Sequence, residues 1–586
     1  MTSTRTTTST RASNQDKRTH HRLRHEVRDP RVRPRPVPPT RSRGGAPNVL
    51  VILLDGAGFG AATAFGGPVR TPTAERLAAS GLRYTRFHTA AMGPPTRAAL
   101  LTGRNQHSAG ISAAPLAEIL RRNGYSTAQF GSCHEAAAWA PGAAVPYQPE
   151  SGVFARCCGA MDAETDRRRP LRAEGAASSG GHLVSELADT AIEYLRTRRH
   201  RAPDTPFFAC FAPGAAHAQH VPEDVVGRYR GRFDGGWDAL RADTFARQRE
   251  LGVIDPGSVL TPRPDALPAW DDVAEEWKPA LRRRMEVAAA SLEYADRQAG
   301  RVVDALEETG LLADTLVVYM VGAPSDTGPD GVPLPAAAAR NGEPAAPHPP
   351  PDGPDAAADH AAGWAHALCT PYRWTREGAS HYGGTRNATI VHWPKGIEER
   401  GGLRHQWHHV IDIAPTVLEL AGITPPETVD SVPQAPMHGT SLAYSFNAPD
   451  AAERHHTQYF ELMGDRAIYD QGWTAVTKHP TPWDALATGG GFSEDAWELY
   501  DTRTDWTQAR DLSKEHPEKL AELQLKFIIE ASRFDVFPRD EPPWGEARRA
   551  RRAGAGRSGA VAPGDVPAQR ERHGEALADG GRPRHR

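Results

Sequence analysis

An unbroken apolar run that ends in a carboxylate, Asn48 to Asp55 (NVLVILLD), constrains the fold more than any other feature of the sequence. A strand that is buried on both faces reads as a continuous apolar run, because neither of its faces meets water. Similar runs follow at Thr205 to Phe211 and at Thr315 to Val321, with a weaker one at Thr389 to Trp393. Strands of this kind occur in sheets covered by helices on both sides, so the sequence predicts an α/β fold.

Segments with helical periodicity lie between and after these runs. They are Thr73 to Ser80, His182 to Thr197, Arg284 to Glu308, Val410 to Leu420 and Pro517 to Ser532. Buried strands that alternate with helices predict a mostly parallel sheet flanked by helices. Ligands of such sheets bind at the carboxyl ends of the strands, where Asp55 and His217 fall, so we expect the functional site there.

Composition divides the 586 residues into ordered and low-complexity parts. Residues 1–46 carry 12 Lys or Arg against three acids, which predicts a disordered basic arm. A Pro-rich stretch at about 329–362 predicts a disordered insertion, and residues 545–586 predict a disordered tail. We expect the main α/β domain at 47–425 and a smaller C-terminal α+β domain, one long helix against a short antiparallel sheet, at 426–540.

Charge and hydropathy exclude several classes of function. With 69 basic and 72 acidic residues the net charge is -3, so no general field attracts nucleic acid. No run approaches the roughly 18 apolar residues of a membrane span, and residues 1–46 hold no signal-peptide core. Five cysteines without a CxxC pair argue against a disulfide framework and against a zinc site. We therefore expect a cytoplasmic protein with neither a nucleic-acid nor a membrane partner.

A dinucleotide-binding motif follows the first strand but lacks its context. The segment Gly56 to Ala61 (GAGFGA) fits the GxGxxA pattern, which works only where a helix begins and faces the pyrophosphate. Gly66, Gly67 and Pro68 would break such a helix within six residues. The sequence therefore argues against a nicotinamide or flavin enzyme.

Longer motifs extend over most of the chain. They include PNVLVILLD, TPTAERLAASGLRYTRFHT and PPTRAALLTGRNQHSAG between residues 47 and 110, then RWTREGASHYGGTRNATIVHWPKGI and HHVIDIAPTVLELAGI further on. In this order, from about Pro47 to Phe537, they closely resemble the arylsulfatases, members of the sulfatase family in the alkaline-phosphatase superfamily. The resemblance implies an alkaline-phosphatase-like α/β fold and the hydrolysis of aryl or alkyl sulfate monoesters, a sulfuric-ester hydrolase activity.

The resemblance also shows where this chain departs from the family. Sulfatases attack sulfur with a formylglycine hydrate made from the Cys or Ser of a C/S-x-P-x-R motif. The matching segment here is Gly93-Pro94-Pro95-Thr96-Arg97. Glycine has no side-chain atom to oxidise, so no formylglycine can form at Gly93. Thr96 offers a hydroxyl nearby, but nothing adjacent would activate it. We expect an inactive or severely impaired enzyme.

The family's metal site is reduced in the same way. The resemblance implies a Ca²⁺ held by three carboxylates and an Asn, but only Asp55 remains, while Gly56, Ala323 and Pro324 stand at the other ligand positions. Because Ca²⁺ takes six to eight oxygens, we expect its binding to be weak or absent. Asp326 could approach the site, and Asp55 could instead cap the turn that follows it.

The groups that face the sulfate in the family are better kept. By resemblance Arg97, His134 and His217 would be catalytic groups, and Arg376, in place of a lysine, would bind the substrate together with His217. Each has an alternative role: the histidines as partly buried packing residues, and Arg97 as an anchor for a helix over Ala98 to Leu101.

Other conspicuous residues receive simpler interpretations. His408 and His409 precede a helix and are interpreted as packing or capping residues, and Asn387 opens a glycosylation sequon that matters only in a secreted protein. Two functions remain open for the chain as a whole. One is a sulfatase that uses water or Thr96. The other is a non-catalytic protein that binds a small-molecule sulfate ester, an inorganic anion or a protein partner.

Overall fold

The computed structural model describes residues 45–110, 113–131, 156–158, 183–214, 221–265, 267–323, 362–375, 378–479 and 495–536. Nearly all of the basic arm, the insertion and the tail expected from the sequence lies outside these residues. Within the described ranges, no helix is both long enough and apolar enough to cross a membrane.

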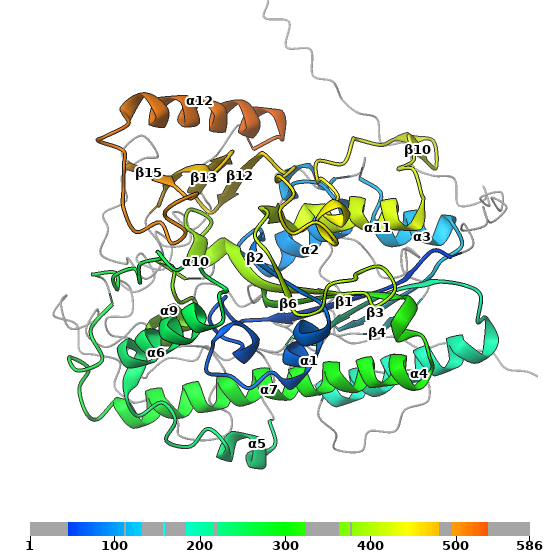
Figure 1. The fold of residues 1–586 in the computed structure, drawn as a ribbon, viewed down its shortest axis with the longest axis horizontal. Helices are drawn as coiled ribbons and strands as arrows, with labels where there is room; N and C mark the ends of the chain where they lie inside the picture. The colour runs from blue at the N-terminus through cyan, green and yellow to red at the C-terminus, as the bar shows by residue number, and fades with distance from the viewer. Residues whose placement is uncertain are drawn as a thin grey trace, which may run out of the picture.

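Nine described strands form one mixed sheet in the order β4-β3-β5-β1-β6-β7-β2-β8, with β9 paired to β2 (Figure 1). They are β1 (Asn48–Asp55), β2 (Leu82–His88), β3 (Ser126–Gly131), β4 (Arg156–Cys158), β5 (Phe207–Ala212), β6 (Thr315–Ala323), β7 (Arg386–His392), β8 (Gly402–Arg404) and β9 (His408–His409). Strand β1 is central and pairs in parallel with both β5 and β6, whereas β7 runs antiparallel to β6 and β2. The four strands expected from apolar runs correspond to β1, β5, β6 and β7, which confirms the predicted fold class.

Helices cover both faces of this sheet. They are α1 (Pro72–Ser80), α2 (Gly93–Thr102), α3 (Leu116–Arg122), α4 (Leu183–Arg201), α5 (Glu223–Gly227), α6 (Gly236–Glu250), α7 (Lys278–Glu308), α9 (Ala362–Leu368), α10 (Tyr382–Thr385) and α11 (Ile413–Ala421). Short 3-10 turns lie at η1 (Thr63–Phe65), η2 (Gln106–Ser108), η5 (Leu312–Asp314), η6 (Val410–Asp412) and η7 (Ala443–Ser445).

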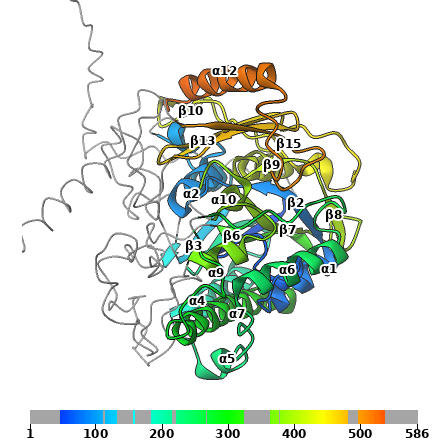
Figure 2. The ribbon, with the colours of Figure 1, turned by 90° about the vertical axis from the view of Figure 1, so that its left-hand side faces the viewer.

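Alternate side chains of β1 enter two different cores. Leu50, Ile52 and Leu54 pack with α1, α4 and α7, while Val49, Val51 and Leu53 pack with α2, α3 and α11. Figures 1 and 2 show these two groups of helices on opposite faces of the sheet. All eight residues of β1 are buried, because a central strand has helices on both sides.

A second, antiparallel sheet lies above α2 and carries the C-terminal helix (Figure 1). Its strands are β12 (Thr457–Leu462), β13 (Asp465–Asp470), β14 (Trp473–Thr477) and β15 (Trp497–Asp501), preceded by the small hairpin β10 (Thr428–Val429) and β11 (Val432–Pro433). Helix α12 (Pro517–Arg533) packs on the outer face through Leu523, Phe527 and Ala531. The inner face packs on Ala91, Met92 and Trp407 of the main body, so this sheet supports the turn that leads into α2.

The segment after β1 is not a dinucleotide-binding turn. Residues 56–62 form a loop that reaches η1, and the next helix, α1, begins only at Pro72. Gly58 and Gly60 instead allow this loop to pack directly against the backbone of Leu368 and Thr370, where a Cβ would lie within 2.6 Å of a carbonyl oxygen. The absence of a helix at this point confirms that the motif lacks the required context.

Candidate functional site

The carboxyl ends of the central strands meet at one edge of the sheet. Asp55, the last residue of β1, pairs with Ala323, the last residue of β6. On the other side of β1, the ends of β3 and β5 pair through Gly131 and Ala212. Because β7 is antiparallel, it begins at this edge, with Arg386. The edge expected to carry the site is therefore formed as the sequence predicts.

Some of the expected site residues fall within the described residues and others do not. Asp55, Gly56, Gly93, Thr96 and Arg97 are described, as is the backbone of Ala323. The remaining expected residues lie outside the described ranges: His134, His217, Pro324, Asp326 and Arg376. Their roles stay predictions, although the strands that precede His134 and His217 do end at this edge.

Gly93 is the first residue of helix α2, at the position that the resemblance assigns to the nucleophile. Met92 before it has an extended conformation, and Ala91 has φ +61°, so the chain turns sharply into the helix. The sequence interpretation started this helix at Ala98, which is wrong by five residues. Proline lacks an amide donor and favours the first helical turn, so Pro94 and Pro95 are the signal that marks the true start.

The Thr96 hydroxyl is engaged inside the same turn. Its Oγ1 accepts a hydrogen bond from the backbone N–H of Ala90 at 3.2 Å, and the residue is only 1% exposed. This bond closes the turn that presents Gly93. The hydroxyl therefore holds the backbone in place, which argues against its use as a substitute nucleophile.

Arg97 lies on α2 and pairs directly with the carboxylate that ends β1. Its Nη1 donates to Asp55 Oδ2 at 2.9 Å, and both side chains are at most 3% exposed. The pair differs from both roles that the sequence left open for Asp55, metal binding and turn capping. It also gives Arg97 a wider role than anchoring its own helix, because it ties α2 to β1 across the sheet edge. The guanidinium neutralises the only carboxylate kept at the family's metal positions.

Two glycines with positive φ shape the ends of β1 and β6. Gly56 has φ +83° and Gly322 has φ +117°, conformations that L-amino acids with side chains rarely adopt. At Gly322 a Cβ would lie 2.5 Å from Asn387 Oδ1 and 2.9 Å from Ala57 O. The backbone of β6 therefore approaches the loop after β1 and the start of β7 more closely than any larger residue would permit.

Asn387 connects these segments to the turn before α2, a role that the sequence interpretation missed. Its Nδ2 donates to Thr89 Oγ1 at 2.6 Å and to Thr385 O at 2.9 Å, and Thr89 N donates to Thr385 O at 2.7 Å. Asn387 is 1% exposed, so its amide is not presented as a glycosylation acceptor. Its position at the start of β7, four residues after Gly383, is the available signal.

Two buried histidines support the site from behind without adding charge. Burial, reinforced by the charge of Arg386, lowers the pKa of His88 well below its usual value, and burial lowers the pKa of His409 to about 3. His409 accepts from Ile411 N and so caps η6, while His408 Nδ1 lies 2.9 Å from Asp412 Oδ2. The packing and capping roles expected for His408 and His409 are confirmed.

The described residues do not fit a calcium site. Asp55 is paired with Arg97, Gly56 has no side-chain oxygen, and alanine at position 323 supplies none. Asn387 Nδ2 is bonded to Thr89, and its Oδ1 faces Gly322. Within the described ranges, no group of three or more His, Cys, Asp or Glu could hold a metal ion. A hard cation that needs six to eight oxygens finds one neutralised carboxylate here.

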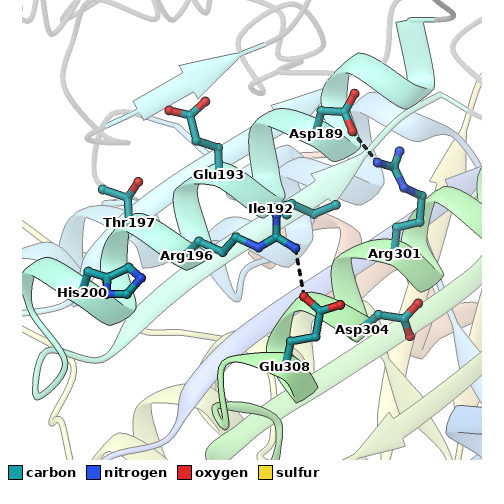
Figure 3. Close-up of a pocket in the computed structure, with 9 residues that line it drawn as sticks. All are labelled: Asp189, Ile192, Glu193, Arg196, Thr197, His200, Arg301, Asp304 and Glu308. Atoms are coloured by element: carbon teal, nitrogen blue, oxygen red, sulfur yellow. Dashed lines mark hydrogen bonds and ion pairs between the residues drawn. The ribbon is translucent and has the colours of Figure 1, made fainter.

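A separate groove lies between α4 and α7, away from this edge (Figure 3). Its residues Arg196, His200 and Glu308 belong to the helix ends that lead into β5 and β6, and therefore lie toward the opposite edge of the sheet. Arg196 pairs with Glu308 at 2.9 Å and Arg301 pairs with Asp189 at 2.5 Å. The groove offers exposed, mutually neutralised charges, which provide control positions for experiments on the site.

Known proteins resemble this chain in both sequence and fold. The sulfatase family model matches residues 47–423. An uncharacterised sulfatase of Schizosaccharomyces pombe is 28% identical over 543 residues, covering 82% of this chain and 93% of that protein. An arylsulfatase of Klebsiella aerogenes is 25% identical over 447 residues, covering 68% and 91%. The structure of BT4656 in complex with its substrate D-glucosamine-2-N,6-O-disulfate gives a TM-score of 0.53 at 17% identity, over 85% of this chain and 100% of that one.

Proposed function

The chain belongs to the sulfatase family, and from this premise we propose that it binds sulfate monoesters or inorganic sulfate without hydrolysing them at a sulfatase's rate. The observation that carries the proposal is Gly93 at the first position of α2, where the family has its nucleophile precursor. Loss of a covalent nucleophile costs about 10⁶-fold in turnover in a triad-type enzyme. Bound Ca²⁺ would supply orientation and charge to the reacting group, but the described residues do not fit that ion.

The Asp55–Arg97 pair supports the same proposal. In a calcium-dependent site a free carboxylate would face the metal, whereas here the carboxylate is held by a guanidinium at 2.9 Å. The pair leaves the sheet edge close to neutral, and a buried ion pair of this kind is not readily separated by a weakly held cation. Any attraction for an anion then comes from Arg376 and the two histidines, His134 and His217, that the resemblance places beside the sulfate.

The alternative function, a sulfatase that uses water or Thr96, has less support. Thr96 Oγ1 is buried and accepts from Ala90 N, so using it as a nucleophile would break the turn that forms the site. A water nucleophile would need a base, and His88 and His409 are buried, with pKa values well below the usual range. Neither group replaces the lost chemistry.

Hydrolysis of a chromogenic aryl sulfate by the purified full chain tests the proposal. The assay is run with and without Ca²⁺, beside a His217→Ala variant and an Arg196→Ala control in the distant groove. We expect no turnover above background in any sample. Turnover that His217→Ala abolishes and Arg196→Ala retains would overturn the proposal in favour of an active sulfatase.

Titration calorimetry with sodium sulfate and with the same aryl sulfate tests the binding part. We expect saturable binding of both ligands, weakened at least tenfold in Arg376→Ala and unchanged in Arg196→Ala. Binding that is absent from a folded protein, or insensitive to Arg376→Ala, would contradict a retained sulfate site.

A further inference from the structure

Two buried arginines meet between the main sheet and the C-terminal segment that follows β15. Arg86 lies on β2 and Arg386 begins β7, two strands that pair with each other. Arg86 is 9% exposed and Arg386 is 1% exposed. Both contact the same residue, because the Arg86 guanidinium lies 5.9 Å from the Trp506 ring centre and Arg386 Nη1 donates to Trp506 O at 3.3 Å.

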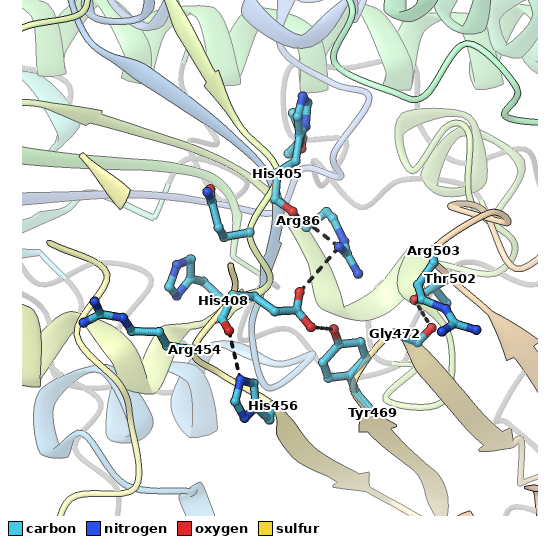
Figure 4. Close-up of polar contacts among 12 residues, drawn as sticks. Arg86, His405, His408, Arg454, His456, Tyr469, Gly472, Thr502 and Arg503 are labelled. Atoms are coloured by element: carbon cyan, nitrogen blue, oxygen red, sulfur yellow. Dashed lines mark hydrogen bonds and ion pairs between the residues drawn. The ribbon is translucent and has the colours of Figure 1, made fainter. Parts of the chain in front are cut away.

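The positive charges of these two side chains are only partly compensated. Arg86 Nη1 lies 3.6 Å from Glu453 Oε2 and donates to His405 O at 3.4 Å, while the other oxygen of Glu453 accepts from Tyr469 OH. Figure 4 shows Arg86 and Tyr469 pointing toward one another from the two sheets. Among the described residues, Glu453 is the carboxylate that contacts this pair of arginines, so one negative charge faces two positive ones.

Arg386 is surrounded by neutral groups. Its Nη1 donates to Tyr372 OH at 2.9 Å, its Nε lies 3.4 Å from His88 Nε2, and its Cζ lies 4.4 Å from the Tyr382 ring centre. Aromatic rings and a neutral imidazole stabilise a guanidinium less than a carboxylate does. This arginine therefore keeps an uncompensated charge in a buried position.

Several N–H groups of the cluster are buried and lack a hydrogen-bond acceptor within the part of the chain that the structure describes. They are Arg86 Nε and Nη2, Arg386 Nη2, and Gln508 Nε2. Gln508 is 1% exposed, and its Oε1 accepts from Tyr382 N at 2.8 Å, which fixes the amide so that its NH₂ group is the free end. All four are donors. Buried donors without acceptors are costly, and more so when they carry charge.

The electrostatic field confirms that the two arginines act on one region. Burial raises the pKa of Tyr372, and the charges of Arg386 and Arg86 both oppose that shift. Burial lowers the pKa of His88, and the same two charges lower it further. A region that holds surplus donors and a positive field is complementary to a small anion.

We propose that Arg86, Arg386 and Gln508 bind a small inorganic oxyanion of the sulfate or phosphate class between the main sheet and the C-terminal segment. Trp506 is half-buried and bounds the site on its outer side, which gives the ligand a route to solvent. This site is separate from the Asp55–Arg97 edge and independent of the proposed function. The anion would join the two parts of the chain by accepting hydrogen bonds from both.

Thermal unfolding in titrations of sodium sulfate and sodium phosphate at constant ionic strength tests the proposal. All proteins carry Arg376→Ala, so that the sulfate site proposed above contributes nothing. We expect a saturable rise in Tm of the parent protein and no rise in Arg86→Met. Arg503→Met is the matched control, because Arg503 lies in the neighbouring loop, is paired with Asp501 and is exposed, and it should respond as the parent does.

Gln508→Glu gives a second test that does not depend on removing a buried arginine. The substitution keeps the shape and the Oε1 acceptor for Tyr382 N, and it replaces the free donor with a negative charge. We expect a higher Tm than that of the parent in anion-free buffer, together with loss of the response to sulfate and phosphate. An equal anion response in Gln508→Glu, Arg86→Met and the parent would overturn the proposal.

Discussion

Arg97 and Asp55, 42 positions apart in the sequence, meet as a buried ion pair with 2.9 Å between Nη1 and Oδ2. The pair joins the first turns of α2 to the last residue of β1, the two elements that form the functional edge in the family. It replaces an arrangement in which several carboxylates surround a cation with one in which a single carboxylate faces a fixed cation. The stability of this edge therefore depends on the protein's own charges.

Removal of Arg97 should destabilise the protein strongly. Breaking a buried pair by deleting one partner costs about 3–5 kcal/mol, because the other charge stays buried. We expect Arg97→Met to lower the free energy of unfolding in urea by that amount, and Arg97→Met with Asp55→Asn to recover part of it. Arg196→Met, which breaks an exposed pair with Glu308, should cost less than about 1 kcal/mol. A double variant no more stable than Arg97→Met would show that the pair is not the cause.

Gly56 should tolerate substitution poorly because of its backbone. At φ +83° a side chain with a Cβ costs about 1–2 kcal/mol, and Asn adopts this region more readily than Ala. We expect Gly56→Ala to lower the Tm more than Gly56→Asn does, with Gly56→Asp, which restores the family's carboxylate, also lowering it. Gly227→Ala, where a Cβ meets open space, should be close to neutral. Equal Tm values for all three Gly56 variants and the parent would contradict this strain.

Stability should fall in mild acid through His409. Burial, assisted by the charge of His455, lowers its folded pKa to about 3, whereas the unfolded value is about 6.5. Between these values the unfolded state holds a proton that the folded state lacks, so stability is full above pH 6.5 and is lost as the pH falls. His409→Asn removes the titration and keeps an acceptor for Ile411 N.

Urea unfolding at pH 7, 6 and 5 measures this contribution. From pH 7 to pH 5, the parent should lose about 2 kcal/mol more than His409→Asn does, since each pH unit below 6.5 is worth about 1.4 kcal/mol for one proton. Parallel pH profiles for the two proteins would show that His409 does not carry the effect.

Neighbouring positions on α12 should differ sharply in their sensitivity. Phe527 is 2% exposed and its ring lies 5.7 Å from that of Trp497, while Ile528 is 51% exposed on the outer face. We expect Phe527→Ala to cost about 3–5 kcal/mol and Ile528→Ala less than about 0.5 kcal/mol in urea unfolding. Comparable losses at the two positions would mean that the outer face of α12 is covered in solution.

The sequence predicted the central architecture because β1, β5 and β6 are buried on both faces and carry unbroken apolar runs. It missed β2 (Leu82–His88) as a strand, since Arg83 and Arg86 interrupt its apolar pattern. Those arginines are accommodated because the strand pairs with β7 in the sheet and the C-terminal sheet covers the neighbouring region. Such compensation depends on tertiary contacts that no local window contains.

The candidate site was predicted in position but not in chemistry. The vacancy at Gly93 follows from one letter, and the start of α2 could have been read from Pro94 and Pro95. The Asp55–Arg97 pair and the role of Asn387 could not, because each joins segments tens to hundreds of residues apart and depends on side-chain directions. The same holds for Arg86 and Arg386, whose shared surroundings arise only when β2 and β7 pair.

The position of β1 in the sheet also bears on how the chain is made. Its partner β6 begins at Thr315, some 260 residues after the end of β1 at Asp55. At synthesis rates of about 5–20 residues per second, the β6-facing side of β1 waits roughly 15–50 s for its partner. During that time an apolar strand edge is exposed to other nascent chains. Slower production of the chain, or a longer wait caused by codon choice between these strands, should therefore lower the yield of correctly folded protein.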